Sequence, residues 1–277
     1  MRYLIASLIC SVAPAFAACP KGEFLFAGAA YCVKAHRHVN LPIDDGDRRK
    51  TPGGWVADTA SVDPKAYIGP KAQVYEFAQV VGKARIKESA RIKGEAQIYA
   101  ADISGSVSVT DKVVVYKATL AGSRVYLGGY VAVHDGAQIL DRASIIGDQG
   151  EIVIRDQAIV RQDAVIRGEA KIMGKSRIEG HAHIDDQAEL RDTIVADDAK
   201  VYKQAHLEDA VVFGSAQIYG SAHVDAESYV YGDARVYGET RVSDGAWLCK
   251  GFYDKGVVLD KDTQCKPPTQ RIWDDAR

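Results

Sequence analysis

The stretch from Ala72 to Ile98 reads AQVYEF-AQVVGK-ARIKES-ARIKGE-AQI, with a small residue followed two places later by Val or Ile in every six residues. The pattern runs with few breaks from about Ala60 to Leu248. Successive side chains of a strand point to opposite faces, so the small and the aliphatic residue share one face. A six-residue unit cannot bury that face alone and becomes stable only when units stack around a continuous core. The repeat therefore predicts a solenoid of short strands.

These repeats resemble those of the hexapeptide-repeat proteins, whose fold is a left-handed parallel β-helix with three short strands in each coil of about 18 residues. The resemblance covers about two thirds of the chain. It implies an all-β solenoid of about ten coils. Gly often stands two places after the aliphatic residue, as in Val230-Tyr231-Gly232, which is similar to a poorly characterised Ala-x-Val-x-Gly branch often labelled as transferases. The activity does not follow from the fold.

The first 17 residues have the organisation of a secretory signal peptide. Arg2 precedes an apolar run, and Ala15-Phe16-Ala17 forms a small-x-small cleavage site. The run is too short for a permanent transmembrane anchor, so we expect an exported chain, either periplasmic or secreted, without one. An alternative is a lipoprotein, because the residues before Cys19 resemble a lipobox.

The cysteines indicate two disulfides. Cys10 leaves with the signal peptide, and the other four form one pair near each end, Cys19 with Cys32 and Cys249 with Cys265. An even count, local spacing and an exported chain favour disulfide pairing. Lipidation of Cys19 would leave Cys32 as a lone thiol.

The repeat divides the chain into four segments. We expect a signal peptide over 1–17, an N-terminal cap and linker over 18–56, the β-helix over 57–248, and a closing hairpin and tail over 249–277. Both ends of a solenoid expose unpaired strand edges, and the disulfide-stapled caps would cover them.

Some repeats depart from the six-residue period. It shortens to five from Leu190 to Val195 and from Leu207 to Val212. Two larger disturbances, at 126–130 and 147–150, predict bulges at corners. Loops on a regular scaffold often carry binding residues, although small insertions explain the same stretches.

Offsets of 17 or 18 residues become columns of outward side chains, spaced by about 4.8 Å. One predicted column comprises Arg167, Asp185, Tyr202, Tyr219 and Tyr237, and a neighbouring one comprises His206, His223 and Arg241. Exposed aromatic rings suit carbohydrate or partner-protein binding, because they offer apolar area with little rotamer entropy to lose. We therefore expect Tyr202, Tyr219, Tyr237, His206 and His223 to bind a polysaccharide or an envelope protein. Stacking that only stabilises neighbouring strands explains the same tyrosines.

The histidines of one strand raise two further hypotheses. His181, His183 and Asp185 share an outward face, which would suit a metal ion, but Asp163 and Asp198 beside His181 equally make a charge-balanced surface. We expect no metal and no cofactor.

The resemblance to hexapeptide acyltransferases implies a surface His as general base and a homotrimer with acyl-CoA in the grooves between subunits. His181 is the candidate base, with Asp163 and Asp198 holding its tautomer. An exported chain would need a donor other than cytosolic acyl-CoA.

Several function classes are disfavoured. The formal net charge is −2, and it becomes more negative when Arg2 is removed, so nucleic acid is not an expected partner. The related carbonic anhydrases need two His five residues apart, a spacing that this chain lacks. We expect an exported rigid binding or structural module, with an acyltransferase as the alternative. Trimers or end-to-end fibres are compatible with both.

Overall fold

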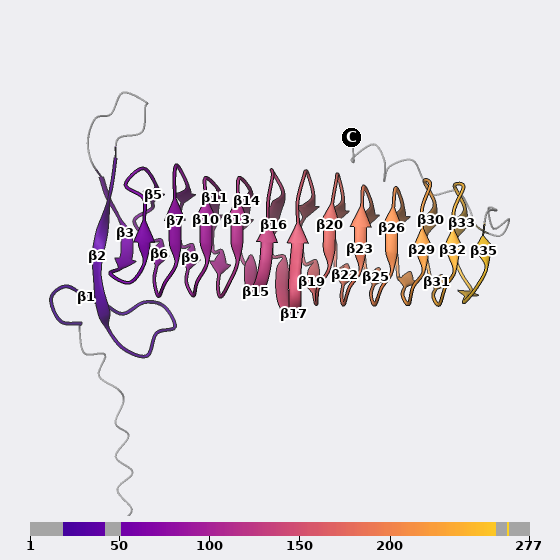
Figure 1. The fold of residues 1–277 in the computed structure, drawn as a ribbon, viewed down its shortest axis with the longest axis horizontal. Coiled ribbons are helices and arrows are strands. Elements are labelled where there is room, and N and C mark those ends of the chain that lie inside the picture. The colour runs from indigo at the N-terminus through magenta and orange to yellow at the C-terminus, as the bar shows by residue number, and fades with distance from the viewer. Residues whose placement is uncertain (1–18, 42–50, 259–264, 266–277) are drawn as a thin grey trace, which may run out of the picture.

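The computed structural model describes residues 19–41, 51–258 and 265, and these form an elongated β-solenoid without a helix (Figure 1). Within the coils, each strand pairs in parallel with the strand one coil further on, as in Gln97 with Val114. The front strands run upward while the coils advance to the right, which defines a left-handed solenoid (Figure 1). The predicted fold class is therefore confirmed. The expected signal peptide lies outside the described residues, as does most of the expected tail.

The solenoid has three faces, which we call first, second and third in the order in which each coil passes through them. The second face has eleven strands, one for each coil, close to the ten coils expected. Its strands are β5 (Tyr67–Ile68), β8 (Arg85–Ile86), β11 (Asp102–Gly105), β14 (Thr119–Gly122), β16 (Gln138–Asp141), β18 (Ile159–Val160), β21 (Arg177–Ile178), β24 (Ile194–Val195), β27 (Val211–Val212), β30 (Tyr229–Val230) and β33 (Trp247–Leu248).

The first and third faces are built in the same way. The first face contains β4 (Ser61–Val62), β7 (Gln79–Val81), β10 (Gln97–Tyr99), β13 (Val114–Tyr116), β20 (Lys171–Met173), β23 (Glu189–Arg191), β26 (His206–Glu208), β29 (His223–Val224), β32 (Arg241–Val242) and β35 (Val257–Val258). The third contains β6 (Gln73–Val74), β9 (Arg91–Ile92), β12 (Ser108–Val109), β19 (Val165–Arg167), β22 (His183–Ile184), β25 (Lys200–Val201), β28 (Gln217–Ile218), β31 (Arg235–Val236) and β34 (Phe252–Tyr253). The strands β15 (Tyr126–Val133) and β17 (Ser144–Ile154) are long enough to belong to both faces.

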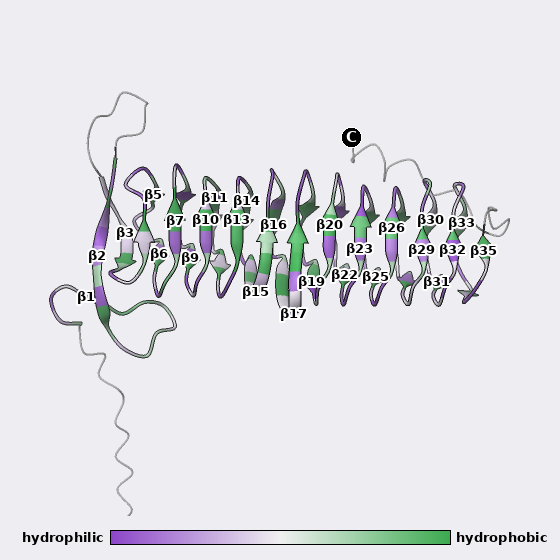
Figure 2. Ribbon diagram, viewed as in Figure 1, coloured by the Kyte–Doolittle hydropathy of each residue, from purple (hydrophilic) through white to green (hydrophobic). Residues whose placement is uncertain are grey.

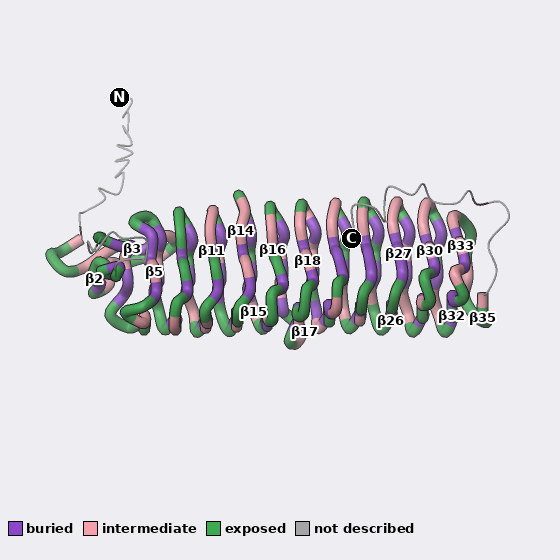
Figure 3. Tube along the Cα trace, turned by 90° about the horizontal axis from the view of Figure 1, so that it is seen from above, coloured by how far each residue is buried: buried purple, intermediate pink, exposed green. Residues whose placement is uncertain are grey.

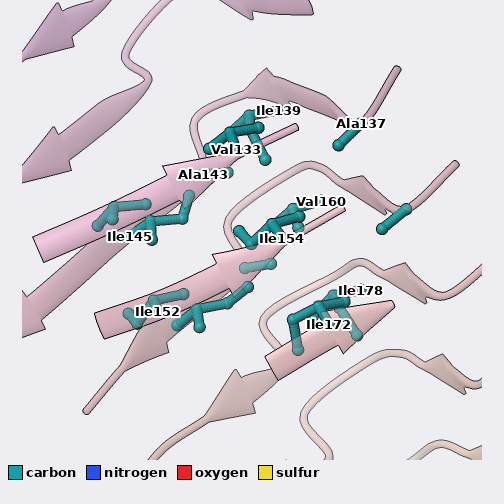
Figure 4. Packing of buried hydrophobic residues seen from close by; sticks show 14 of the residues in the cluster. Val133, Ala137, Ile139, Ala143, Ile145, Ile152, Ile154, Val160, Ile172 and Ile178 are labelled. Carbon is teal, nitrogen blue, oxygen red and sulfur yellow. The ribbon is translucent and has the colours of Figure 1, made fainter. Parts of the chain in front are cut away.

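One continuous core fills the interior, and it consists of the repeat's small and aliphatic residues. Ala78 and Val80, for example, are both buried, whereas Gln79 between them is exposed. Figure 4 shows this packing in the middle of the solenoid, where Ile139 of β16 and Ile145 and Ile154 of β17 point inward. Hydropathy and burial accordingly alternate along the strands (Figures 2 and 3). The period-two prediction is confirmed.

The corners require a backbone conformation that most residues avoid. Many corner residues have positive φ, and those that are not Gly are mostly acidic, such as Glu76 at 59° and Asp111 at 61°. Their carboxylates accept hydrogen bonds from corner amides of the next coil, namely Glu76 Oε2 from Gly94 N at 2.7 Å, Asp111 Oδ2 from Gly129 N at 3.0 Å, and Asp156 Oδ2 from Gly174 N at 2.9 Å. These side chains therefore link successive coils where the backbone turns.

The two predicted bulges lie inside long strands. Residues 126–130 belong to β15 and residues 147–150 to β17, and these two strands pair with each other around the corner. Gly129 pairs with Gly147, and Val131 pairs with Ile152. Between these pairs β15 has one residue and β17 has four, so a register shift accommodates the three additional residues of β17. The disturbance expected at 126–130 is present as this register shift between Gly129 and Val131, and Gly129 adopts a positive φ of 78° there. The shorter coils are confirmed, with Leu190 opposite Leu207.

The N-terminal cap covers the first coil. Strand β2 (Val33–Asn40) pairs antiparallel with β1 (Glu23–Phe24) and with β3 (Thr51–Ala57), and β3 then joins β6 in parallel. Figure 1 shows β2 standing across the end of the solenoid. The buried Asn40 side chain makes two hydrogen bonds of the kind that a neighbouring strand would make. Asn40 Nδ2 donates to Ile68 O at 3.0 Å, and Asn40 Oδ1 accepts from Ile68 N at 2.8 Å.

The two ends carry the predicted disulfides, Cys19–Cys32 and Cys249–Cys265. The C-terminal end differs from the expected closing hairpin over its described part. Strand β34 pairs in parallel with β31, and β35 pairs in parallel with β32. Residues 252–258 therefore continue the solenoid, although their coil steps shorten from 18 residues to 17 at Phe252 and 16 at Val257.

The Asn40 contact gives a test of the cap. Replacing Asn40 with Ala leaves the buried amide and carbonyl of Ile68 without their partner, which lowers the free energy of unfolding by about 2–4 kcal/mol. Urea denaturation measures this change. Val39→Ala, at an exposed neighbouring position, is the matched control and should change the free energy by much less. Equal effects of the two substitutions would contradict the proposed role of Asn40.

Candidate functional site

Three tyrosines stack at the corner between the third and first faces. Tyr202, Tyr219 and Tyr237 follow β25, β28 and β31 directly. Ring centroids are 4.8 Å apart for the first pair and 5.0 Å for the second, and the planes are inclined by 8° and 5°. The predicted column is present, but its members are half-buried rather than fully exposed. The rings cover one another's faces, so mainly their edges are available for contacts from outside.

A polar ladder runs beside the tyrosines, and the sequence analysis missed it. Gln187 Nε2 donates to Glu169 Oε2 at 2.9 Å, and Gln204 Nε2 donates to Gln187 Oε1 at 3.4 Å. Ser221 Oγ donates to Gln204 Oε1 at 3.5 Å. The 17-residue offset from Gln187 to Gln204 was the available signal. We call Tyr202, Tyr219, Tyr237, Gln187, Gln204 and Ser221 the corner strip.

The two predicted histidines continue this surface onto the first face. His206 and His223 are register partners on β26 and β29, and their ring centroids are 5.3 Å apart. His206 Nδ1 lies 3.7 Å from Glu189 Oε2. Burial, followed by the neighbouring His206 and Arg241, lowers the pKa of His223. Two successive coils thus present Tyr, a polar side chain and His in sequence, namely Tyr202, Gln204 and His206, and then Tyr219, Ser221 and His223.

His181 lies at a different corner, between the second and third faces, just before β22. Its Nε2 is 3.8 Å from Asp163 Oδ2, and its Nδ1 is 3.6 Å from Asp198 Oδ1. The predicted carboxylate neighbours are thus both present. Asp163 also pairs with Arg142, and the His181 side chain is 70% exposed. The structure does not bring His181 into the corner strip.

His183 projects from β22, and burial together with the positive charges of Lys200 and Arg167 lowers its pKa. Within the described residues, no group of three or more His, Cys, Asp or Glu is arranged to hold a metal ion. The described residues also contain no helix long and apolar enough to cross a membrane.

Several solved structures are similar to about two thirds of this chain, at low sequence identity. No family model and no curated protein matches the chain. Among solved structures, the UDP-N-acetylglucosamine O-acyltransferase of Moraxella catarrhalis is 14% identical with a TM-score of 0.32, over 66% of this chain and 71% of that one. The LpxA of Acinetobacter baumannii is 13% identical with a TM-score of 0.33, over 66% and 71%. The Arabidopsis UDP-N-acetylglucosamine acyltransferase is 16% identical with a TM-score of 0.28, over 66% and 69%.

These likenesses concern the fold alone. The chain's own parallel strands, stacked coil on coil in three faces, form the β-helix that the repeats predicted. This fold by itself does not define an activity.

The lowered pKa of His183 predicts acid sensitivity. At pH values between the lowered pKa of His183 in the folded chain and its ordinary value of 6.5, the unfolded chain binds more protons than the folded chain. The folded state is therefore favoured above pH 6.5, and this contribution to stability is lost as the pH falls through the folded pKa. We expect His183→Gln to flatten the decline in melting temperature between about pH 7 and pH 5. Lys200→Gln keeps the imidazole but removes one positive neighbour, and should give an intermediate slope. An unchanged slope in His183→Gln would rule out this contribution.

Proposed function

We propose that this chain is an exported, rigid β-helix that binds a polysaccharide along the corner strip. The observation that carries the proposal is the near-parallel stacking of Tyr202, Tyr219 and Tyr237 beside an amide and hydroxyl ladder. Since the ring faces are occupied, recognition would use ring edges, phenolic hydroxyls and the amides of Gln187 and Gln204. Such groups donate and accept hydrogen bonds, as a polyhydroxylated ligand requires.

The geometry of the strip supports an extended polymer rather than a small molecule. Equivalent groups recur at about 4.8 Å along the solenoid axis, so a repeating ligand would meet a repeating surface. Paired parallel strands flank the corner on both sides and hold these groups in a fixed arrangement, which reduces the entropy lost on binding. The two disulfides support an oxidising compartment, either the periplasm or the exterior.

Replacing the three hydroxyls tests this function. The triple variant Tyr202→Phe/Tyr219→Phe/Tyr237→Phe keeps the stacked rings but removes three hydrogen-bonding groups. We expect its affinity on a polysaccharide array to fall at least about tenfold, because each such bond contributes about 0.5–1.5 kcal/mol.

Tyr116→Phe, which removes a hydroxyl from another corner, is the matched control and should bind as the unmodified protein does. Equal binding by the triple variant would contradict recognition through the hydroxyls. Binding to an envelope protein in place of any polysaccharide would overturn the proposed ligand class.

A second candidate function is acyl transfer, favoured by the two carboxylates beside His181. His181 would take the proton of an acceptor hydroxyl while that oxygen attacks the acyl carbon. The donor's leaving group would depart and receive a proton in turn. Asp198, close to Nδ1, would fix the tautomer and stabilise the charged ring. A homotrimer belongs to this second proposal.

Acyl transfer from a short-chain thioester to water or a sugar hydroxyl tests this candidate. We expect His181→Gln to lower kcat by about 10²–10⁴-fold if the residue is a general base. His36→Gln, which replaces a cap histidine paired with Asp58, should leave the rate unchanged. Equal rates for the unmodified protein, His181→Gln and the uncatalysed reaction would exclude this function.

A further inference from the structure

The second face carries an apolar column on its outer side near the C-terminal end. Ile194, Val211, Tyr229 and Trp247 are register partners on β24, β27, β30 and β33. The last three of these strands lie in a row in Figure 3. Their sequence neighbours face the core, so alternation directs these four side chains outward. Nearer the N-terminal end the same column is polar, with Arg85, Asp102, Thr119 and Gln138.

These outward residues are shielded from water. Ile194 is 5% exposed and Val211 is 0% exposed. Phe213 and Tyr231 stack beside them with ring centroids 4.9 Å apart, and Tyr229 meets Trp247 edge-on at 6.5 Å. We call Ile194, Val211, Phe213, Tyr229, Tyr231 and Trp247 the apolar stripe. Apolar side chains that point outward from the sheet and are nevertheless shielded indicate that a further layer of the protein packs on this face.

The C-terminal disulfide attaches the chain to one end of this stripe. Cys249 lies two residues after Trp247 and is bonded to Cys265, whose sulfur also accepts a hydrogen bond from Cys249 N at 2.9 Å. Twelve residues follow Cys265, and they read KPPTQRIWDDAR. The next stretch of chain therefore starts beside the stripe.

We propose that residues 266–277 dock along the apolar stripe, with Ile272 and Trp273 as the buried anchors. The stripe spans three coil steps, or about 14 Å, from Trp247 to Ile194. Twelve extended residues reach up to about 40 Å, so the segment is long enough. Pro267 and Pro268 favour an extended conformation immediately after the disulfide.

Charge complements the far end of the stripe. Arg177, the register partner of Ile194, and Arg161 both contact Glu179, at 3.3 Å and 2.6 Å respectively. Together these three side chains carry a net positive charge. In the C-terminal segment the acidic pair Asp274 and Asp275 follows the two anchors directly. A segment running from Cys265 toward Ile194 brings this pair to the arginines.

The disulfide between Cys249 and Cys265 allows a short segment to dock on the stripe. A twelve-residue peptide in solution would bind such a surface weakly, but the disulfide holds it at a high effective concentration. The occupant is thus part of the same chain, and the docking does not depend on the proposed polysaccharide function.

Limited trypsin digestion tests the docking in the full oxidised chain. The bond after Arg271 should be cleaved at least tenfold more slowly than in a synthetic peptide of residues 266–277. Trp273→Ser should abolish most of this protection, whereas Gln270→Ser should retain it, each normalised to its own peptide. Cleavage of the unmodified chain at the peptide's rate would overturn the proposal.

Removal of residues 266–277 gives a second readout that leaves the solenoid and both disulfides in place. We expect the truncated chain to bind several-fold more of an apolar fluorescent dye, because the stripe is uncovered. Unchanged dye binding would contradict the docking. A full-length chain that sediments as a dimer and is cleaved at the peptide's rate would assign the stripe to a second copy instead.

Discussion

The structure depends on how the chain turns its corners. Each coil has to change direction three times without leaving the parallel ladder, and positive φ at a corner residue makes the turn short. Glycine adopts this conformation freely, while acidic residues such as Asp111 and Asp156 tolerate it and bond an amide of the next coil. The same residue therefore turns one coil and links it to the next. Because the links repeat, outward side chains align closely enough for Tyr202 and Tyr219 to stack.

The stacking of the tyrosines changes how the surface can act. An isolated exposed ring offers its face to a ligand, whereas Tyr219 packs between two neighbours. What remains is a narrow band of ring edges bordered by amides and by the imidazoles of His206 and His223. His181 stands at another corner, largely exposed between two carboxylates. The two candidate sites are consequently separate surfaces of one rigid body, and each can be altered without disturbing the other.

The sequence was sufficient to predict the core, because the Ala and the aliphatic residue of each six-residue unit face the interior. It was also sufficient for the disulfides, because each end of the chain has one nearby pair of cysteines. The columns of outward residues were harder to predict. Coils of 17 and 18 residues occur together, so the register between distant coils depends on the length of every corner between them. Gly128-Gly129 resembled a loop but continues β15, and the chain near Phe252 resembled a hairpin but continues the solenoid. The polar ladder and the apolar stripe were missed for the same reason. Ile194 and Val211 looked like ordinary core residues until the alternation was seen in the structure.

The cap at the N-terminal end has a consequence for size. The Asn40 side chain bonds the backbone of Ile68 and β3 pairs with β6, so the first coil is covered on its N-terminal side. Eleven coils at about 4.8 Å each give a rod of roughly 50 Å. Each duplicated or deleted coil would lengthen or shorten this rod by one increment while leaving its cross-section unchanged. The number of coils, counted from the capped end, therefore sets the length of the molecule.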